Sequence, residues 1–259
     1  MKPTVVICPG AWQLEAFYDP LKRAFEALDY PTVCKLSNGY PDHDPDETPE
    51  INLDTTFLRE HVLKPLVEEG KEIVLFMHSY GGVYGPAALE GFGELERKRA
   101  GLQGGVIAAI YTAAFIARKG TSTMSVMGFS DDNLPSWIDL DEATGLVSFH
   151  KDHAKVMVFH DLPPEEAERL ASSLPKQPAS CFSEPVHWDP YEAESFQGRL
   201  GYIYTEADRI LPLDFQKRFV QTAGIKHTAM LEGCSHSPHI EMPKKLAETV
   251  IGMLDTLTR

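Results

Sequence analysis

The sequence lacks a long apolar run. Its N-terminus has only a short apolar stretch before Pro9 and Gly10, whereas a signal peptide needs roughly 7–15 apolar residues and a small-residue cleavage site. No segment approaches the roughly 18–20 apolar residues of a membrane-spanning helix. We therefore expect no export signal, no membrane partner and a cytoplasmic location.

Basic residues and cysteines are also scarce. The 259 residues include 24 Lys and Arg against 38 Asp and Glu, a formal net charge of −14. Nucleic acids and anionic membranes are bound by basic surfaces, so we expect neither as a partner. Cys8, Cys34, Cys181 and Cys234 show no C-x-x-C spacing, and we interpret them as free thiols in a reducing compartment.

Apolar segments alternate with amphipathic ones along most of the chain. This alternation predicts an α/β fold, with a mainly parallel sheet of about six strands and helices on both faces. The expected strands are residues 4–8, 32–36, 73–77, 106–113, 200–205 and 227–231. Helices are expected at 17–28, at 53–69, after the His-Ser-Tyr-Gly-Gly turn to about Leu89, and at 243–257, and an acidic, Pro-rich surface loop is expected at 37–50.

The alternation lapses between Phe115 and Gly198. An interruption of this length is too long for a simple connection within a compact domain. We therefore predict an α/β core formed by residues 1–115 and 199–259, with residues 116–198 inserted as a lid, or cap, subdomain. One helix is expected within the lid, at PPEEAERLASSL.

The segment IVLFMHSYGGVYG presents Ser79 between a predicted buried strand and a helix. This layout is typical of a nucleophile elbow, in which a tight turn exposes the serine hydroxyl. Gly81 and Gly82 supply the small residues after the serine. The position two before it, usually glycine, is Met77, and Pro86 lies inside the expected helix, so the motif is incomplete by itself.

Two later loops supply a base and an acid. His236 follows the strand at 227–231 and is the expected base, with His239 as a competitor that we instead expect to order this loop together with Glu241. Asp208 follows the strand at 200–205 and is the expected acid. The alternatives are Glu206 and Asp214.

The order of these three residues favours catalysis over their ordinary roles. A serine between a strand and a helix is commonly an N-cap, and histidines and aspartates are frequent in loops. Ser79, Asp208 and His236, however, each follow a predicted strand, where ligands bind in open parallel sheets. We predict them as a catalytic triad, with an oxyanion hole formed by the backbone N–H groups of Ala11 and Tyr80.

These residues and their surroundings resemble the α/β-hydrolase superfamily. More narrowly, the chain is similar to the branch that contains plant hydroxynitrile lyases, plant methylesterases and small fungal and bacterial esterases. The similar segments are PGAW (9–12), EEGKEIVLFMHSYGG (68–82), YTAAF (111–115), YIYTEADRILP (202–212) and GCSHSPHIEMP (233–243). The cyanohydrin-cleaving lyases carry a lysine directly after the catalytic histidine. Here that residue is Ser237, so cyanide release is not expected.

The expected function is that of a serine hydrolase acting on a small hydrophobic or aromatic ester or lactone, without a metal or other cofactor. Alternatives are a carbon–carbon bond hydrolase or lyase with the same triad, and a ligand receptor that keeps a vestigial triad. Clusters around His150 and His153 and around His43 are interpreted as solvated surface groups. The partner is a small-molecule substrate, and the oligomeric state is open, with a homodimer as one option. The expected pocket residues are Trp12, Met124, Met127, Phe129, Trp137, Met157 and Phe159.

Overall fold

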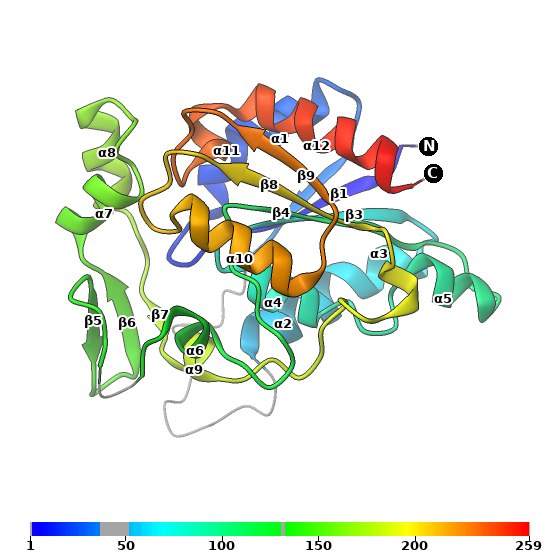
Figure 1. The fold of residues 1–259 in the computed structure, drawn as a ribbon, viewed down its shortest axis with the longest axis horizontal. Helices are drawn as coiled ribbons and strands as arrows, with labels where there is room; N and C mark the ends of the chain where they lie inside the picture. Colours follow the sequence, from blue (N-terminus) through cyan, green and yellow to red (C-terminus); the bar gives the residue numbers. More distant parts are fainter. Residues whose placement is uncertain (1, 37–51, 131–132, 259) are drawn as a thin grey trace.

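Six parallel strands form the central sheet of this computed structural model, which describes residues 2–36, 52–130 and 133–258. Their order across the sheet is β2-β1-β3-β4-β8-β9 (Figure 1). Most of these strands are near-continuous apolar runs because helices cover both faces of the sheet. Their bounds are β1 Thr4–Cys8, β2 Thr32–Cys34, β3 Glu72–His78, β4 Gly105–Thr112, β8 Leu200–Thr205 and β9 His227–Leu231.

Helices pack on both faces of this sheet. In Figure 1, α1 (Asp19–Glu26) and α12 (Pro243–Leu257) lie on one side, with α11 (Pro238–Glu241) beside them. The opposite side carries α4 (Gly81–Ala87), α5 (Glu94–Arg99) and α10 (Leu213–Ala223), and also α2 (Leu53–Leu58), η3 (Arg59–Leu63) and α3 (Lys64–Glu68). The predicted six-stranded α/β architecture is confirmed.

Prolines account for the main departures from the predicted helices. The helix expected at 17–28 begins as the 3₁₀ turn η1 (Glu15–Tyr18), and Pro20 lies in the first turn of α1. The helix expected at 53–69 contains a π turn, η3, directly before α3, whose first turn holds Pro65. Proline has no N–H and cannot continue the regular hydrogen-bond ladder. The strand expected at 32–36 ends at Cys34, and the loop expected at 37–50 lies outside the described residues.

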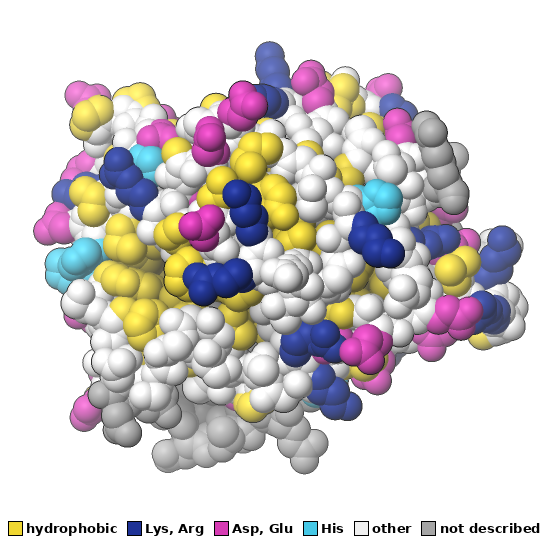
Figure 2. All heavy atoms as spheres, viewed as in Figure 1, with side chains coloured by type: hydrophobic (Ala, Val, Ile, Leu, Met, Phe, Trp, Pro, Cys, Tyr) yellow, Lys and Arg dark blue, Asp and Glu magenta, His cyan; other side chains and the backbone are white. Residues whose placement is uncertain are grey.

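The segment between β4 and β8 forms a second, smaller structure. It contains an antiparallel sheet, in the order β5-β6-β7, and short helices. Figure 1 shows β5, β6, α7 and α8 on the side toward which β8 and β9 run, and Figure 2 shows hydrophobic side chains gathered where this segment meets the core. The bounds are α6 Thr123–Met127, β5 Ile138–Asp141, β6 Leu146–Phe149, α7 Lys151–Met157, α8 Pro164–Ala171, β7 Gln177–Pro178, α9 Ser180–Ser183 and η4 Glu194–Phe196.

Within the described ranges, none of the helices combines the length and the apolar composition needed to cross a membrane.

Candidate active site

Three strands deliver Ser79, Asp208 and His236 to one edge of the sheet. β3 ends at His78, directly before Ser79, and Asp208 and His236 lie in the loops after β8 and β9. Because the three strands are parallel, their carboxyl ends meet at the same edge. The sequence separates the residues by up to 157 positions, and the sheet brings them together.

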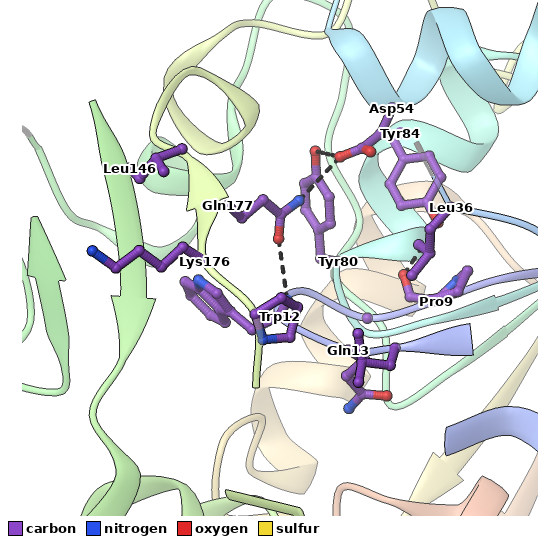
Figure 3. A pocket seen from close by; sticks show the side chains of 13 residues that line it. Pro9, Trp12, Gln13, Leu36, Asp54, Tyr80, Tyr84, Leu146, Lys176 and Gln177 are labelled. Atoms are coloured by element: carbon purple, nitrogen blue, oxygen red, sulfur yellow. Dashed lines mark hydrogen bonds between the residues drawn. The ribbon is translucent and has the colours of Figure 1, made fainter. Parts of the chain in front are cut away.

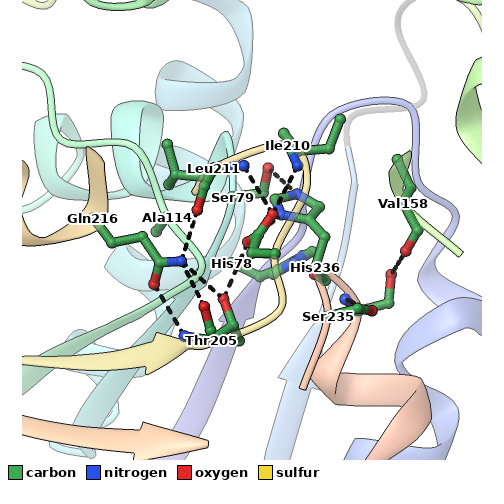
Figure 4. Close-up of polar contacts among 12 residues, drawn as sticks. His78, Ser79, Ala114, Val158, Thr205, Ile210, Leu211, Gln216, Ser235 and His236 are labelled. Atoms are coloured by element: carbon green, nitrogen blue, oxygen red, sulfur yellow. Dashed lines mark hydrogen bonds and ion pairs between the residues drawn. The ribbon is translucent and has the colours of Figure 1, made fainter. Parts of the chain in front are cut away.

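The three side chains form a continuous line of hydrogen bonds, and Figure 4 shows Ser79 and His236 in it. His236 Nδ1 lies 2.8 Å from Asp208 Oδ2, and His236 Nε2 lies 2.9 Å from Ser79 Oγ. A carboxylate only accepts, so Nδ1 carries a proton, and the tautomer that leaves Nε2 free of a proton accepts from the Ser79 hydroxyl. All three side chains are buried. This is the tautomer that a general base beside a serine requires.

The Asp208 carboxylate is oriented by four hydrogen bonds. Oδ1 accepts from the backbone N–H groups of Ile210 and Leu211 at 2.9 and 2.8 Å. Oδ2 accepts from Thr205 Oγ1 at 3.0 Å as well as from His236. The carboxylate therefore cannot rotate away from His236 without losing several bonds.

Gln216, which has no exposed surface, holds the loop that carries Asp208. Its Oε1 accepts from the backbone N–H of Thr205 at 3.0 Å, and its Nε2 donates to the carbonyl oxygens of Thr205 and Leu211 at 2.8 and 2.7 Å (Figure 4). Of the alternative acids, Glu206 accepts from the backbone N–H of Gly233, and Asp214 lies in the first turn of α10. Neither is the carboxylate hydrogen-bonded to His236.

Close packing explains the glycines of the turn after β3. Ser79 has a φ of +53°, in the left-handed region that non-glycine residues seldom adopt. A Cβ on Gly81 would lie 2.3 Å from the carbonyl oxygen of Cys8, and one on Gly82 would lie 2.3 Å from that of Phe115. Only glycine fits at either position.

Met77 occupies the position where the elbow motif usually has glycine, and its side chain is accommodated by a glycine elsewhere. A Cβ on Gly85 would lie 3.0 Å from Met77 Cγ and 3.1 Å from its sulfur. The missing side chain in α4 thus provides space for the extra side chain in β3. This exchange explains how the turn forms despite the incomplete sequence motif.

The turn after β1 lies against the serine. A Cβ on Gly10 would be 3.1 Å from Ser79 Cβ, so the backbone approaches closely. The backbone N–H groups on either side of Ala11 are engaged, since Gly10 donates to Tyr18 Oη at 2.8 Å and Trp12 to Gln177 Oε1 at 3.1 Å. Ala11 and Tyr80 both line the cavity at Ser79. Their role as oxyanion donors stays a prediction.

A narrow cavity of about 50 Å³ adjoins Ser79 and His236. Aromatic rings pack around it: Trp12 stacks on Phe182 with centroids 4.9 Å apart, and Trp137 stacks on Phe149 at the same separation. Of the expected pocket residues, five line the cavity, namely Trp12, Met124, Met127, Phe129 and Trp137.

Met157 and Phe159 are not among the residues that line this cavity, although Val158 between them is. Phe159 is fully buried and packs edge-on against Phe17, with ring centroids 6.4 Å apart. The expectation for these two residues requires correction, because the end of α7 turns Val158 toward the cavity. Phe149 and Phe182 also line the cavity, and the sequence did not predict this. Both residues are far from Ser79 in the sequence, and no local motif indicates that they pack beside it.

A larger hollow, of about 560 Å³, also borders Trp12 and Tyr80 (Figure 3). Figure 3 shows Gln177 extending from β7 between Trp12 and Asp54. Gln177 Nε2 donates to Asp54 Oδ2 at 3.0 Å, and Tyr80 Oη donates to the same oxygen at 3.1 Å. These bonds connect the segment between β4 and β8 to the core beside Ser79.

His239, the competitor for the base, is fully buried against Tyr18, with ring centroids 4.3 Å apart. Burial lowers the pKa of His239 to about 3, so its ring is neutral. In the part of the chain that the structure describes, neither ring nitrogen has a hydrogen-bond partner. Glu241 holds the loop after β9, because it accepts hydrogen bonds from the backbone N–H and the hydroxyl of Ser235.

No group of three potential metal ligands is close enough to hold an ion among the described residues. The cluster around His43 lies outside them.

Comparison with known proteins identifies the class of protein. A model of the alpha/beta hydrolase family matches residues 5–249, and the chain belongs to this family. A probable hydrolase from Phoma sp. is 26% identical, over 97% of this chain and 98% of the relative. The family, fold class and enzyme class predicted from the sequence are confirmed.

Two solved structures share the fold. A pyrethroid hydrolase from Sphingobium faniae is 18% identical with a TM-score of 0.66, covering 98% of each chain. A methylesterase from Arabidopsis is 17% identical with a TM-score of 0.69, covering 98% of this chain and 99% of the other.

Proposed function

We propose that this protein is a serine hydrolase that cleaves a small hydrophobic or aromatic carboxylic ester or lactone through Ser79, His236 and Asp208. The observation that carries the proposal is the hydrogen-bonded line from Asp208 through His236 to Ser79, with distances of 2.8 and 2.9 Å. Of the two solved structures of the same fold, the methylesterase, by its name, acts on methyl esters, and the pyrethroid hydrolase, by its name, acts on pyrethroids. The aromatic rings around the cavity favour an apolar substrate.

In the proposed reaction, the Ser79 hydroxyl attacks the ester carbonyl while His236 Nε2 takes its proton. Asp208 holds the imidazolium that forms. The backbone N–H groups of Ala11 and Tyr80 stabilise the oxyanion. His236 then protonates the departing alcohol as its bond to the acyl carbon breaks. Water attacks the acyl group on Ser79 with His236 again as the base, the bond to Ser79 Oγ breaks, His236 returns the proton to Ser79, and the carboxylic acid is released. No step requires a metal or a cofactor.

A panel of p-nitrophenyl esters of increasing acyl length tests this function. We expect the wild type to turn over, with Ser79→Ala reduced to background and Ser183→Ala, an exposed serine outside the cavity, unchanged. A fluorophosphonate should label the wild type on the peptide that contains Ser79 and leave the Ser79→Ala variant unlabelled. A folded wild type that neither turns over nor is labelled contradicts the proposal.

A further inference from the structure

Tyr18 and His78 connect the turn after β1, the end of β3 and the loop after β9 through a buried series of hydrogen bonds. His78 Nε2 lies 2.7 Å from the carbonyl oxygen of His236, and His78 Nδ1 lies 2.7 Å from Tyr18 Oη. Tyr18 Oη also accepts from the backbone N–H of Gly10 at 2.8 Å. Neither Tyr18 nor His78 has any exposed surface. These hydrogen bonds thus run from Gly10 in the loop after β1, through His78 directly before Ser79, to the backbone of His236.

Each hydrogen bond in this chain has one direction. The carbonyl of His236 can only accept, so His78 Nε2 carries a proton. Burial, and next the neighbouring His239 and His236, lower the pKa of His78, so the ring is neutral and Nδ1 is an acceptor. Burial also raises the pKa of Tyr18, which keeps its hydroxyl protonated. Tyr18 therefore donates to His78 while it accepts from Gly10.

Packing holds the chain in place. A Cβ on Gly10 would lie 3.0 Å from His78 Nδ1, so the loop after β1 rests directly on the imidazole. The ring of Tyr18 is stacked on His239, with an angle of 12° between the planes. The rings of Tyr18 and His78 cannot turn without breaking this packing. Their hydrogen bonds therefore fix the spacing of the loops that they join.

We infer that Tyr18 and His78 are positioning residues, which set the loop carrying Ala11 and the loop carrying His236 at the correct distance from Ser79. This inference rests on the proposed hydrolase function. Neither residue lines the cavity at Ser79, so both act through the groups they hold. A displacement of about 1 Å in such groups can cost about 100-fold in rate. The loss should fall on kcat, because the surfaces that bind the substrate are unchanged.

The test compares Tyr18→Phe with Tyr111→Phe. Tyr111 is equally buried, and its hydroxyl bonds to that of Tyr191 at 3.2 Å, away from the cavity. Both variants lose one buried hydroxyl and are expected to melt at a lower temperature than the wild type. We expect kcat for a p-nitrophenyl ester to fall about 10- to 100-fold in Tyr18→Phe, with KM within about threefold, and both constants to stay unchanged in Tyr111→Phe.

A second pair keeps the test decisive if Tyr18→Phe does not fold. His78→Gln can still donate an amide N–H toward the His236 carbonyl, whereas His78→Leu cannot. We expect at least about tenfold higher kcat in the glutamine variant, together with faster fluorophosphonate labelling of Ser79.

Wild-type kcat in a folded Tyr18→Phe, or equal kcat in the two His78 variants, overturns the positioning role and leaves the hydrolase proposal intact. A wild type without turnover or labelling overturns both.

Discussion

The backbone N–H of Trp12 donates a hydrogen bond to Gln177 Oε1 at 3.1 Å, across 165 positions of the sequence. Trp12 has a φ of +54°, a conformation that costs a non-glycine residue about 1–2 kcal/mol. Its indole Nε1 donates to the carbonyl oxygen of Val147 at 3.1 Å. The inserted segment therefore holds, through two bonds, the strained residue directly after Ala11.

Gln177→Met should weaken this contact at nearly constant volume. The Trp12 N–H loses its acceptor and the Asp54 carboxylate loses a donor, which predicts a loss of about 1–3 kcal/mol in the free energy of unfolding. We also expect a lower kcat, because Trp12 can relax and move Ala11. Urea denaturation and p-nitrophenyl ester kinetics measure the two effects. Gln221→Met, at an exposed position on α10, is the control, and an unchanged kcat in Gln177→Met would argue against this coupling.

Asp208→Asn should abolish most activity while the protein stays folded. The two carboxylate oxygens accept four hydrogen bonds, and an amide must place its NH₂ toward some of those donors. If the NH₂ faces His236, the ring takes the wrong tautomer, a change that costs about 10⁴-fold in kcat in a serine protease. Steady-state kinetics with circular dichroism as the folding check measure this. Asp214→Asn, on α10, should retain wild-type kcat, and equal losses in the two variants would contradict the assignment of Asp208.

Trp137→Ala should widen the cavity at Ser79. Trp137 lines it and stacks on Phe149, so truncation removes a large part of the aromatic wall. One added methylene in an apolar pocket is worth about 1–3 kcal/mol, so we expect the ratio of kcat/KM for hexanoyl over acetyl esters to rise about tenfold. Phe215→Ala, at an exposed phenylalanine of α10 outside the cavity lining, should leave the ratio unchanged. The same ratio in both variants would exclude Trp137 from the acyl site.

The sheet and the order of the site residues were predictable because both depend on local signals. Buried parallel strands appear as short apolar runs, and the C-terminal end of each run marks the place where Ser79, Asp208 and His236 follow. In each case the apolar run and the site residue that follows it are only a few positions apart in the sequence. The predicted limits of the lid, residues 116–198, stay a prediction, as does the cytoplasmic location.

Other features depend on residues that are far apart in the sequence. The space for Met77 is provided by Gly85, and the acceptor for Trp12 is provided by Gln177. The direction of Val158 is set by where α7 ends, which apolar composition alone does not reveal. Nothing in the sequence predicted the contact between Tyr18 and His78, apart from the position of His78 directly before Ser79. Tertiary contacts of this kind have no period or motif that a single sequence displays.

Glu184 should make stability depend on pH near neutrality. Both of its carboxylate oxygens are buried without a hydrogen-bond partner in the described part of the chain, and burial raises the pKa of Glu184 to about 7. In the unfolded chain the pKa of a glutamate is about 4.3. The folded state thus binds this proton more tightly, and the associated stability is fully present below about pH 4.3 and is lost as the pH rises through about 7.

Glu184→Gln removes this titration and should be more stable than the wild type at pH 8, with the difference vanishing toward pH 4.5. Because the residue is partly exposed, we expect only about 1 kcal/mol, or about 2–4 °C in Tm for a chain of this size. Thermal unfolding of both proteins between pH 4.5 and 8 measures the difference in Tm at each pH. The other acidic groups are common to both proteins, so their contribution cancels in this difference. Glu232→Gln, at an exposed position, should show no such pH-dependent gain. A Glu184→Gln curve parallel to that of the wild type would mean that this carboxyl ionises in the folded protein as it does in the unfolded chain.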